Sequence, residues 1–274
     1  MTIRILTLNL WHDQGPWAAR QQRIREWLER LDPDVVGLQE VLRGPGRDQA
    51  TELLAGRGLQ LEFGAASRFW RDPSLEFGNA VASRWPLRDA EVLRLPNAGD
   101  ADGEERIALS VCVETPFGPL GVTCTHLHWR LHHGFVRERQ AMVLADFARR
   151  RRPSLDLPPV IVGDLNAEPD SAEIRYLTGQ QSLGGRSVLF YDAWRLRGDG
   201  GPGITWSNRN PWAAAMHEPD RRLDYVLVGY PQPNGVGRVE SCRVVCDDER
   251  DGVWPSDHFG VYAELRSEPL GPGR

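Results

Sequence analysis

The sequence predicts an α/β protein in which apolar strands alternate with amphipathic helices. Residues 3–10 are apolar on both faces, which is typical of a central strand that is covered on both sides. Residues 17–31 place Trp, Ile and Leu side chains at helical spacing. The hydrophobic content of 41%, the charged content of 26% and the net charge of −5 are those of an ordinary globular protein.

The other elements follow from the same two patterns, apolar runs bounded by turn residues and apolar side chains at helical spacing. The expected helices are 17–31, 46–57 and 136–150, and the expected strands are 3–10, 34–41, 78–87, 106–113, 120–127, 158–166, 222–229, 239–246 and 258–265. The turn-rich link between the fourth and fifth strands predicts a hairpin. Residues 197–220 are expected to form a long loop.

The chain is expected to form one domain over 1–266 with a flexible tail over 267–274, because no linker or short repeat divides it. No apolar run approaches the ~20 residues of a membrane span. The N-terminal residues enter a strand pattern directly, so we expect no signal peptide and a cytoplasmic protein. A monomer is the expected state.

Polar side chains stand at the ends of the predicted strands. Each has a structural explanation when taken alone, as a turn former, a helix cap or a surface residue. Asp164 and Asn166 are two positions apart, so they would project from one face of an extended strand. Because α/β folds carry their ligands at strand ends, we expect the whole set to meet in one cleft. The set is Asn9, Glu40, His126, Asp164, Asn166, Asp224, Asp257 and His258.

Seven segments, in this order, resemble the motifs of the endonuclease/exonuclease/phosphatase superfamily. They are TLNLW, GLQEV, FGNAVASRWPL, THLHW, GDLNAEPDS, RLDYVLV and SDHFGVYAEL, and they extend from residue 5 to about residue 265. The resemblance implies a four-layered α/β sandwich of two packed mixed β-sheets flanked by helices. It also implies a divalent-metal-dependent phosphoesterase, usually with Mg²⁺ and with Mn²⁺ as the alternative.

The resemblance implies a metal site at Glu40, which matches the LQE motif. Asn9 would assist through its carbonyl oxygen, and Asp257 would serve the same ion or a second one. This set is chemically sufficient, because Mg²⁺ prefers oxygen ligands, keeps several waters and needs only one or two protein carboxylates.

The same resemblance implies the catalytic roles. Asp164 would accept a hydrogen bond from the attacking water, and Asn166 would donate to a phosphate oxygen. His258 would bind the phosphoryl oxygen or move a proton, and Asp224 would fix its tautomer and favour its cationic form. His126 would contact the phosphate.

The substrate is expected to be a phosphate ester, and a phosphodiester of a nucleic acid or nucleotide is the first hypothesis. A phospholipid head group or a sugar phosphate is the second. A non-catalytic binding scaffold is the third, and the retained Glu, Asp-x-Asn and Asp-His elements argue against it. Trp11 stands where the abasic-site endonucleases of the superfamily carry an Asp, so the sequence does not favour that activity.

Five tryptophans lie in or beside the candidate segments. They are Trp11, Trp129, Trp206, Trp212 and Trp254. Indole rings at such places stack on bases, hold a lipid or sugar, or pack loops. The sequence leaves these three interpretations open.

The segment from His126 to His133 also contains His128 and His132. Zinc binding is the minor hypothesis for it, because no Cys or carboxylate partner has suitable spacing. His126 in the phosphate site, with the others on a loop, is the preferred interpretation.

Overall fold

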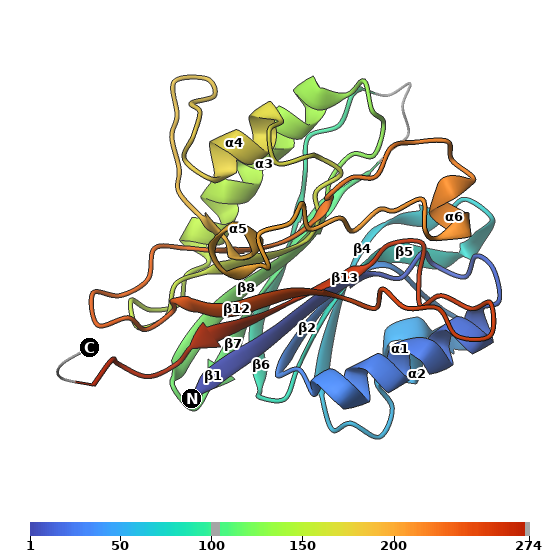
Figure 1. The fold of residues 1–274 in the computed structure, drawn as a ribbon, viewed down its shortest axis with the longest axis horizontal. Helices are drawn as coiled ribbons and strands as arrows, with labels where there is room; N and C mark the ends of the chain where they lie inside the picture. The colour runs from blue at the N-terminus through green and yellow to red at the C-terminus, as the bar shows by residue number, and fades with distance from the viewer. Residues whose placement is uncertain (100–104, 272–274) are drawn as a thin grey trace.

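Two β-sheets pack face to face, and helices flank them on both outer sides (Figure 1). The computed structural model describes residues 1–99 and 105–271. Within them, the first sheet contains β1 (Thr2–Asn9), β2 (Val35–Gly44), β3 (Arg47–Asp48), β4 (Gln60–Phe69), β5 (Asp72–Ser83), β12 (Val239–Val245) and β13 (Gly260–Arg266). The second contains β6 (Leu87–Arg94), β7 (Ile107–Thr115), β8 (Gly118–His126), β9 (Val160–Asp164), β10 (Tyr191–Asp192) and β11 (Asp224–Val228).

The two sheets have related topologies. The first has the order β12-β13-β1-β2-β5-β4, with β3 paired to β2, and the second has the order β10-β11-β9-β8-β7-β6. In each, one central pair is parallel, β1 with β2 and β8 with β9, while the other neighbours run antiparallel. Two mixed sheets between helical layers confirm the predicted four-layered sandwich.

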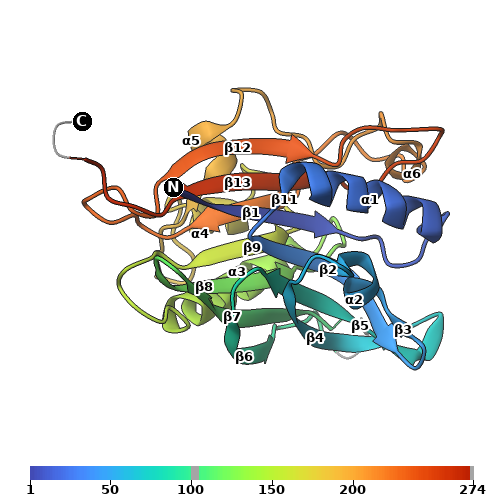
Figure 2. The same ribbon diagram turned by 90° about the horizontal axis from the view of Figure 1, so that it is seen from below.

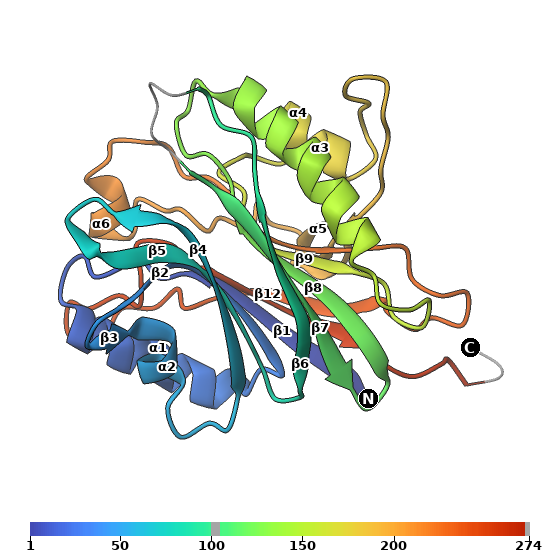
Figure 3. The same cartoon turned by 180° about the vertical axis from the view of Figure 1, so that it is seen from behind.

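The helices cover opposite outer faces (Figure 3). Helices α1 (Trp17–Leu31) and α2 (Gln49–Leu54) lie on the first sheet, and α3 (Gly134–Arg150) and α4 (Ala172–Leu177) lie on the second. Helices α5 (Ala193–Arg197) and α6 (Pro211–Ala214) are single turns near the sheet edges. No helix of the described segments is long and apolar enough to cross a lipid bilayer.

Three apolar layers hold the sandwich together. Val122, Val162 and Val261 are among the buried residues between the sheets. Leu28 belongs to the cluster between α1 and the first sheet, and Phe147 to the one between α3 and the second. Side chains on both faces of each central strand are therefore buried, which explains their continuous apolar runs.

Several elements differ from the sequence-based expectation. The structure places α1 at the expected residues, but the expected helix over 46–57 is the short strand β3 followed by α2, which Asp48 caps through Thr51 N–H at 3.0 Å. Strands β4 and β6 were missed. They lie at sheet edges with partly exposed side chains, so their apolar alternation is weak. The expected loop over 197–220 includes α6.

The N-terminus lies at the end of the sandwich opposite α6 (Figures 1 and 2). The Met1 ammonium group contacts the Glu268 carboxylate at 3.0 Å, and Leu270 N–H donates to Asn234 O at 2.8 Å. The expected flexible tail thus contacts the folded body through these residues. Residues 272–274 of that tail lie outside the described part of the chain.

Gly163 allows β8 and β9 to approach each other beside Asp164. Its φ is +148°, and a Cβ atom at this position would lie 1.9 Å from Thr125 O. Thr125 O belongs to the backbone of a paired strand and cannot move without disturbing the sheet. Residue 163 must therefore be glycine for the two strands to pair.

We expect Gly163→Ala to lower the free energy of unfolding by about 3 kcal/mol, because overpacking and an unfavourable φ act together. Urea denaturation measures this change. Gly56→Ala is the matched control, since its φ is +80° and no heavy atom lies within 4 Å of a Cβ added there. The control should cost about 1 kcal/mol. Equal losses in the two variants would show that the contact with Thr125 O does not matter.

Candidate active site

Three candidate side chains form a row across the second sheet. His126 on β8 and Asp224 on β11 both pair in register with Asp164 on β9. Residues paired across neighbouring strands project from the same face of a sheet. All three side chains are buried, so they form a closely spaced polar group at the strand ends.

Glu40 is brought to the site by an irregularity in β2. The pairing of β2 with β5 shifts register between Leu38 and Val41, and Glu40 has a φ of +56°. Such a bulge redirects a side chain relative to the regular alternation of a strand. Asn9 Nδ2 donates to Glu40 Oε1 at 3.1 Å, so the bulge places the carboxylate beside the end of β1.

Asn9 connects the two sheets. Its Nδ2 also donates to Asp164 Oδ2, at 3.0 Å, across the interface between the sheets. Its Oδ1 accepts a hydrogen bond from Trp11 N–H at 2.9 Å. The amide therefore orients both carboxylates, and the carbonyl oxygen that we expected to assist the metal is engaged by the backbone.

Asp257 lies in the loop before β13, next to the end of β1. Ser256 Oγ donates to Asn9 O at 2.7 Å and lies 3.1 Å from Asp257 Oδ1. Asn210 Nδ2 donates to Ser256 O at 2.7 Å, which fixes this loop from the side of α6. The hydroxyl and the amide together hold Asp257 near Asn9 and Glu40.

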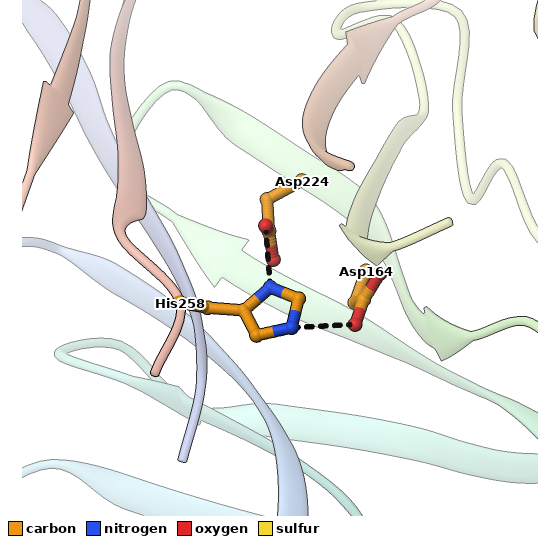
Figure 4. A group of neighbouring side chains, drawn as sticks. All are labelled: Asp164, Asp224 and His258. Atoms are coloured by element: carbon orange, nitrogen blue, oxygen red, sulfur yellow. Dashed lines mark hydrogen bonds and ion pairs between the residues drawn. The ribbon is translucent and has the colours of Figure 1, made fainter. Parts of the chain in front are cut away.

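His258 lies between two carboxylates (Figure 4). Its Nδ1 is 2.9 Å from Asp224 Oδ2, and its Nε2 is 3.6 Å from Asp164 Oδ2. Burial opposes the charge of the imidazolium, but the two carboxylates outweigh burial and raise the pKa of His258 well above its usual value. The ring is therefore a cation whose Nε2–H points toward Asp164.

His126 has the opposite protonation. Arg106 Nη1 lies 2.8 Å from His126 Nδ1, and a guanidinium can only donate, so Nδ1 accepts and the proton resides on Nε2. Burial, and the charge of Arg106, lower the pKa of His126 well below its usual value. His126 Nε2 lies 3.4 Å from Asp164 Oδ2. Asp164 thus faces one neutral and one cationic imidazole.

Asn166 follows β9 in a left-handed turn, with a φ of +48°. The expected strand over 158–166 ends at Asp164, and Asn166 N–H donates to Asp164 Oδ1 at 2.9 Å. Asn166 Nδ2 donates to Leu127 O at 3.2 Å and carries a second hydrogen on the cavity wall.

Two carboxylates are suited to a divalent cation. Burial raises the pKa of Glu40, although the Asn9 amide donates to it. Burial raises the pKa of Asp257 to about 6, and the charge of Glu40 contributes to this rise. The charge of Asp164 adds to the rise in the pKa of Glu40. A cation with a preference for oxygen ligands would stabilise both charged forms, so the donor set fits Mg²⁺ or Mn²⁺.

A second group of possible ligands is Asp164, Asp224 and His258, whose ligand atoms lie within 4.8 Å of one another. His258 Nδ1 lies 2.9 Å from Asp224 Oδ2 and its Nε2 lies 3.6 Å from Asp164 Oδ2, so both ring nitrogens face carboxylates. In this geometry the group acts as a hydrogen-bonded unit.

A cavity of about 710 Å³ opens above these residues. Glu40, His126, Asp164, Asn166, Asp257 and His258 line it, whereas Asn9 and Asp224 bond to them from behind. The eight predicted residues therefore meet at one place. Trp11, Trp129, Trp206 and Trp212 also line the cavity, while Trp254 does not and stacks on Phe259 at 5.5 Å.

His128, His132 and His133 do not line this cavity. His128 Nε2 and His133 Nδ1 lie 3.3 Å apart, and the His132 and His133 rings are in contact. They form a loop cluster beside the site, as the preferred interpretation of the sequence had it.

Sequence reasoning missed four residues of the site. His12, Arg106 and Trp70 line the cavity, and Arg20 lies buried behind it. Arg20 had a visible signal, because it occupies the apolar face of α1, four residues before Ile24. His12 and Trp70 had none beyond their place in loops.

The chain matches the model of the Endonuclease/Exonuclease/phosphatase family over residues 6–258. The chain belongs to this family. Its members are hydrolases, typically metal-dependent phosphoesterases. No curated protein gives a significant match in sequence.

Solved structures of family members superpose over almost the whole chain. An endonuclease/exonuclease/phosphatase from Beutenbergia cavernae DSM 12333 is 26% identical, with a TM-score of 0.73 over 97% of this chain and 71% of that one. Truncated Caenorhabditis elegans TDP2 is 18% identical, with a TM-score of 0.75 over 97% and 98%. The human Nocturnin catalytic domain, with bound sulfate, is 21% identical, with a TM-score of 0.72 over 96% and 94%.

We expect Asp224→Asn to lower the pKa of His258, because the substitution removes the negative charge that favours the imidazolium. NMR titration of the His258 ring measures this pKa. A raised pKa means that the cation and its contacts are fully present below about pH 6.5 and are lost as pH rises through the folded-state value. The alkaline limb of the rate profile should therefore move to lower pH. The turnover rate should fall about 10²–10⁴-fold.

His258→Ala should cost about as much turnover as Asp224→Asn, and the double variant little more, because the two residues act as a unit. Multiplicative losses in the double variant would show that they act independently. Unchanged turnover with a lower melting temperature in Asp224→Asn would leave Asp224 a structural role only.

Proposed function

We propose that the protein is a divalent-metal-dependent phosphodiesterase that acts on a nucleic acid or nucleotide. The observation that carries the proposal is the surrounding of Asp164, which faces the Asn9 amide, neutral His126 and cationic His258 at the floor of one cavity. Hydrolysis of a phosphate ester needs an oriented water and positive charge near the phosphate. In this cluster Asp164 can accept a hydrogen bond from the water, and the His258 imidazolium supplies positive charge.

Glu40 and Asp257 would hold the ion, with Mg²⁺ as the first choice and Mn²⁺ as the alternative. When bound, such an ion neutralises charge on the phosphate oxygens and on the leaving oxygen. Asn9 keeps Glu40 in place through its amide. His12 Nε2 lies 4.0 Å from Glu40 Oε2, and burial lowers the pKa of His12 to about 4, so this neighbour adds no charge at neutral pH.

The protein side chains orient the water and the phosphate. Asp164 accepts a hydrogen bond from the attacking water and receives its proton as the oxygen bonds to phosphorus. The second amide hydrogen of Asn166 and the Nε2–H of His126 bind phosphate oxygens. His258 supplies the positive charge, and Asp224 holds its ring. The bond between phosphorus and the leaving oxygen breaks opposite the attacking water.

Two exposed tryptophans support a nucleic-acid substrate. Trp70 and Trp129 line the cavity, and their exposed fractions are 63% and 41%. Arginines accompany both, since Arg68 lines the same wall as Trp70 and Arg130 lies 5.0 Å over the Trp129 ring. Rings flanked by cations suit unpaired bases between phosphates. TDP2 from D. rerio, a structural relative, forms a complex with a single-strand DNA product.

Activity should require Mg²⁺ or Mn²⁺ and should disappear in EDTA, because the buried carboxylates need a cation. Glu40→Gln should raise the half-saturating metal concentration by about 10-fold or more, by analogy with other losses at metal sites. A metal titration of the initial rate measures this. Full activity of the metal-free protein would contradict the assignment.

Trp70→Ala and Trp129→Ala should each raise KM for a single-stranded oligonucleotide by about 10-fold, since stacking contributes ~1–3 kcal/mol per base. Steady-state rates on single-stranded and duplex DNA, RNA and small phosphodiesters measure it. Tyr230→Ala is the control, because Tyr230 is 65% exposed and does not line the cavity. Preference for phospholipid vesicles over every nucleic acid would replace this substrate with a lipid head group.

A further inference from the structure

Arg20 on α1 is completely buried, and its guanidinium is surrounded by backbone carbonyl groups. The acceptors are the carbonyl oxygens of Leu10 at 2.7 Å, Trp11 at 3.2 Å, His12 at 3.0 Å, Gln14 at 2.9 Å and Pro255 at 3.1 Å. A guanidinium has five N–H groups. These five bonds therefore satisfy the group completely without a carboxylate.

The five acceptors belong to two segments that carry site residues. Residues 10–14 follow Asn9 directly, and Pro255 comes two positions before Asp257. Ser256 Oγ, between these segments, donates to Asn9 O. Arg20 thus fixes the end of β1 and the loop before β13 to one rigid group behind the active site.

The backbone of the first segment depends on this contact. Trp11 and His12 have φ values of +54° and +33°, which non-glycine residues rarely adopt. In this conformation both carbonyl groups turn toward Arg20. Such backbone persists only where the surroundings determine it strongly, and it clusters at functional sites. Arg20 contributes to that determination together with Gln49, whose Nε2 donates to His12 O at 3.0 Å, and Gln14, whose N–H donates to Trp11 O at 3.2 Å.

The charge of Arg20 is retained in its buried position. Burial lowers the pKa of Arg20 to about 10, so it remains a cation at neutral pH. The rings of Trp11, Trp17 and Trp212 surround it at 5.0–5.9 Å. Lysine would offer only three N–H groups from a single point, so it could not reproduce the planar set of five bonds.

We propose that Arg20 is a positioning residue of the active site, which holds the loop that carries Asp257 against the end of β1, beside Asn9 and Glu40. The proposal rests on the proposed function of this site, and it adds a residue that touches neither the ion nor the substrate. Arg20 acts through the backbone of residues 10–14 and of Pro255.

The test compares Arg20→Gln and Arg20→Lys with Arg23→Gln in the full chain. Arg23 lies on the same helix, is 6% exposed and bonds to Glu26 and to Asp248 Oδ1, away from the cavity. Arg23→Gln therefore measures how much stability is lost when a buried arginine of α1 that does not contact the site is replaced. Binding of MnCl₂ followed by electron paramagnetic resonance, hydrogen–deuterium exchange and steady-state rates are measured for all variants, together with melting temperatures.

In Arg20→Gln we expect Mn²⁺ affinity to fall about 10-fold or more, as for other residues that orient metal ligands. Amide exchange should accelerate in peptides that cover 9–16 and 253–259, and kcat should fall about 100-fold, as expected for misplaced groups, with a smaller change in KM. Arg20→Lys, which keeps the charge and part of the bonding, should lie between Arg20→Gln and the wild type. Arg23→Gln should lower the melting temperature while Mn²⁺ affinity and kcat remain those of the wild type.

The proposal is overturned if Arg20→Gln lowers the melting temperature as Arg23→Gln does while Mn²⁺ affinity, local exchange and kcat stay at wild-type values. If Arg20→Gln does not fold, Arg20→Lys decides by the same three measurements. A wild-type protein that binds Mn²⁺ but hydrolyses no phosphate ester would refute the proposed reaction. The binding and exchange data would still decide the role of Arg20.

Discussion

The hydrogen bond from Asn9 Nδ2 to Asp164 Oδ2 is the contact on which the site depends, because it crosses from one sheet to the other. Each sheet alone holds only some of the polar groups. The first sheet supplies Asn9 and Glu40, and the second supplies His126, Asp164 and Asp224. The apolar layer between the sheets must therefore be packed correctly before the two halves can meet.

The protonation states of His126 and His258 follow from the charged side chain that contacts each ring on the side away from Asp164. Arg106 contacts one ring and Asp224 the other, so burial in the same cavity produces a neutral donor and a cationic donor around a single carboxylate. The two histidines therefore differ in protonation because the cation Arg106 contacts His126 and the carboxylate of Asp224 contacts His258. In such a cluster the surrounding charges determine the chemistry as much as the groups that face the substrate do.

The layer architecture was predicted from the resemblance of seven sequence motifs to a known family. The eight candidate residues could be proposed from the sequence because each adjoins an apolar strand, and the structure brings them to one place. The sequence was insufficient for Arg106, whose partner His126 lies on another strand, and for the protonation of both histidines, which depends on such contacts. The edge strands β4 and β6 were missed because partial exposure removes the apolar alternation. The bulge at Glu40 leaves no local pattern, since pairing between β2 and β5 creates it.

The position of the chain ends has a further consequence. Met1 and Glu268 are in contact, and Met1 precedes β1, whose opposite end carries Asn9 at the active site. The N-terminus lies at the end of the sandwich away from α6 (Figures 1 and 2). A tag, a tether or a second domain joined before Met1 would emerge away from the entrance for substrate. The contact between Met1 and Glu268 also makes the fold a good scaffold for circular permutation, with new ends opened in a surface turn.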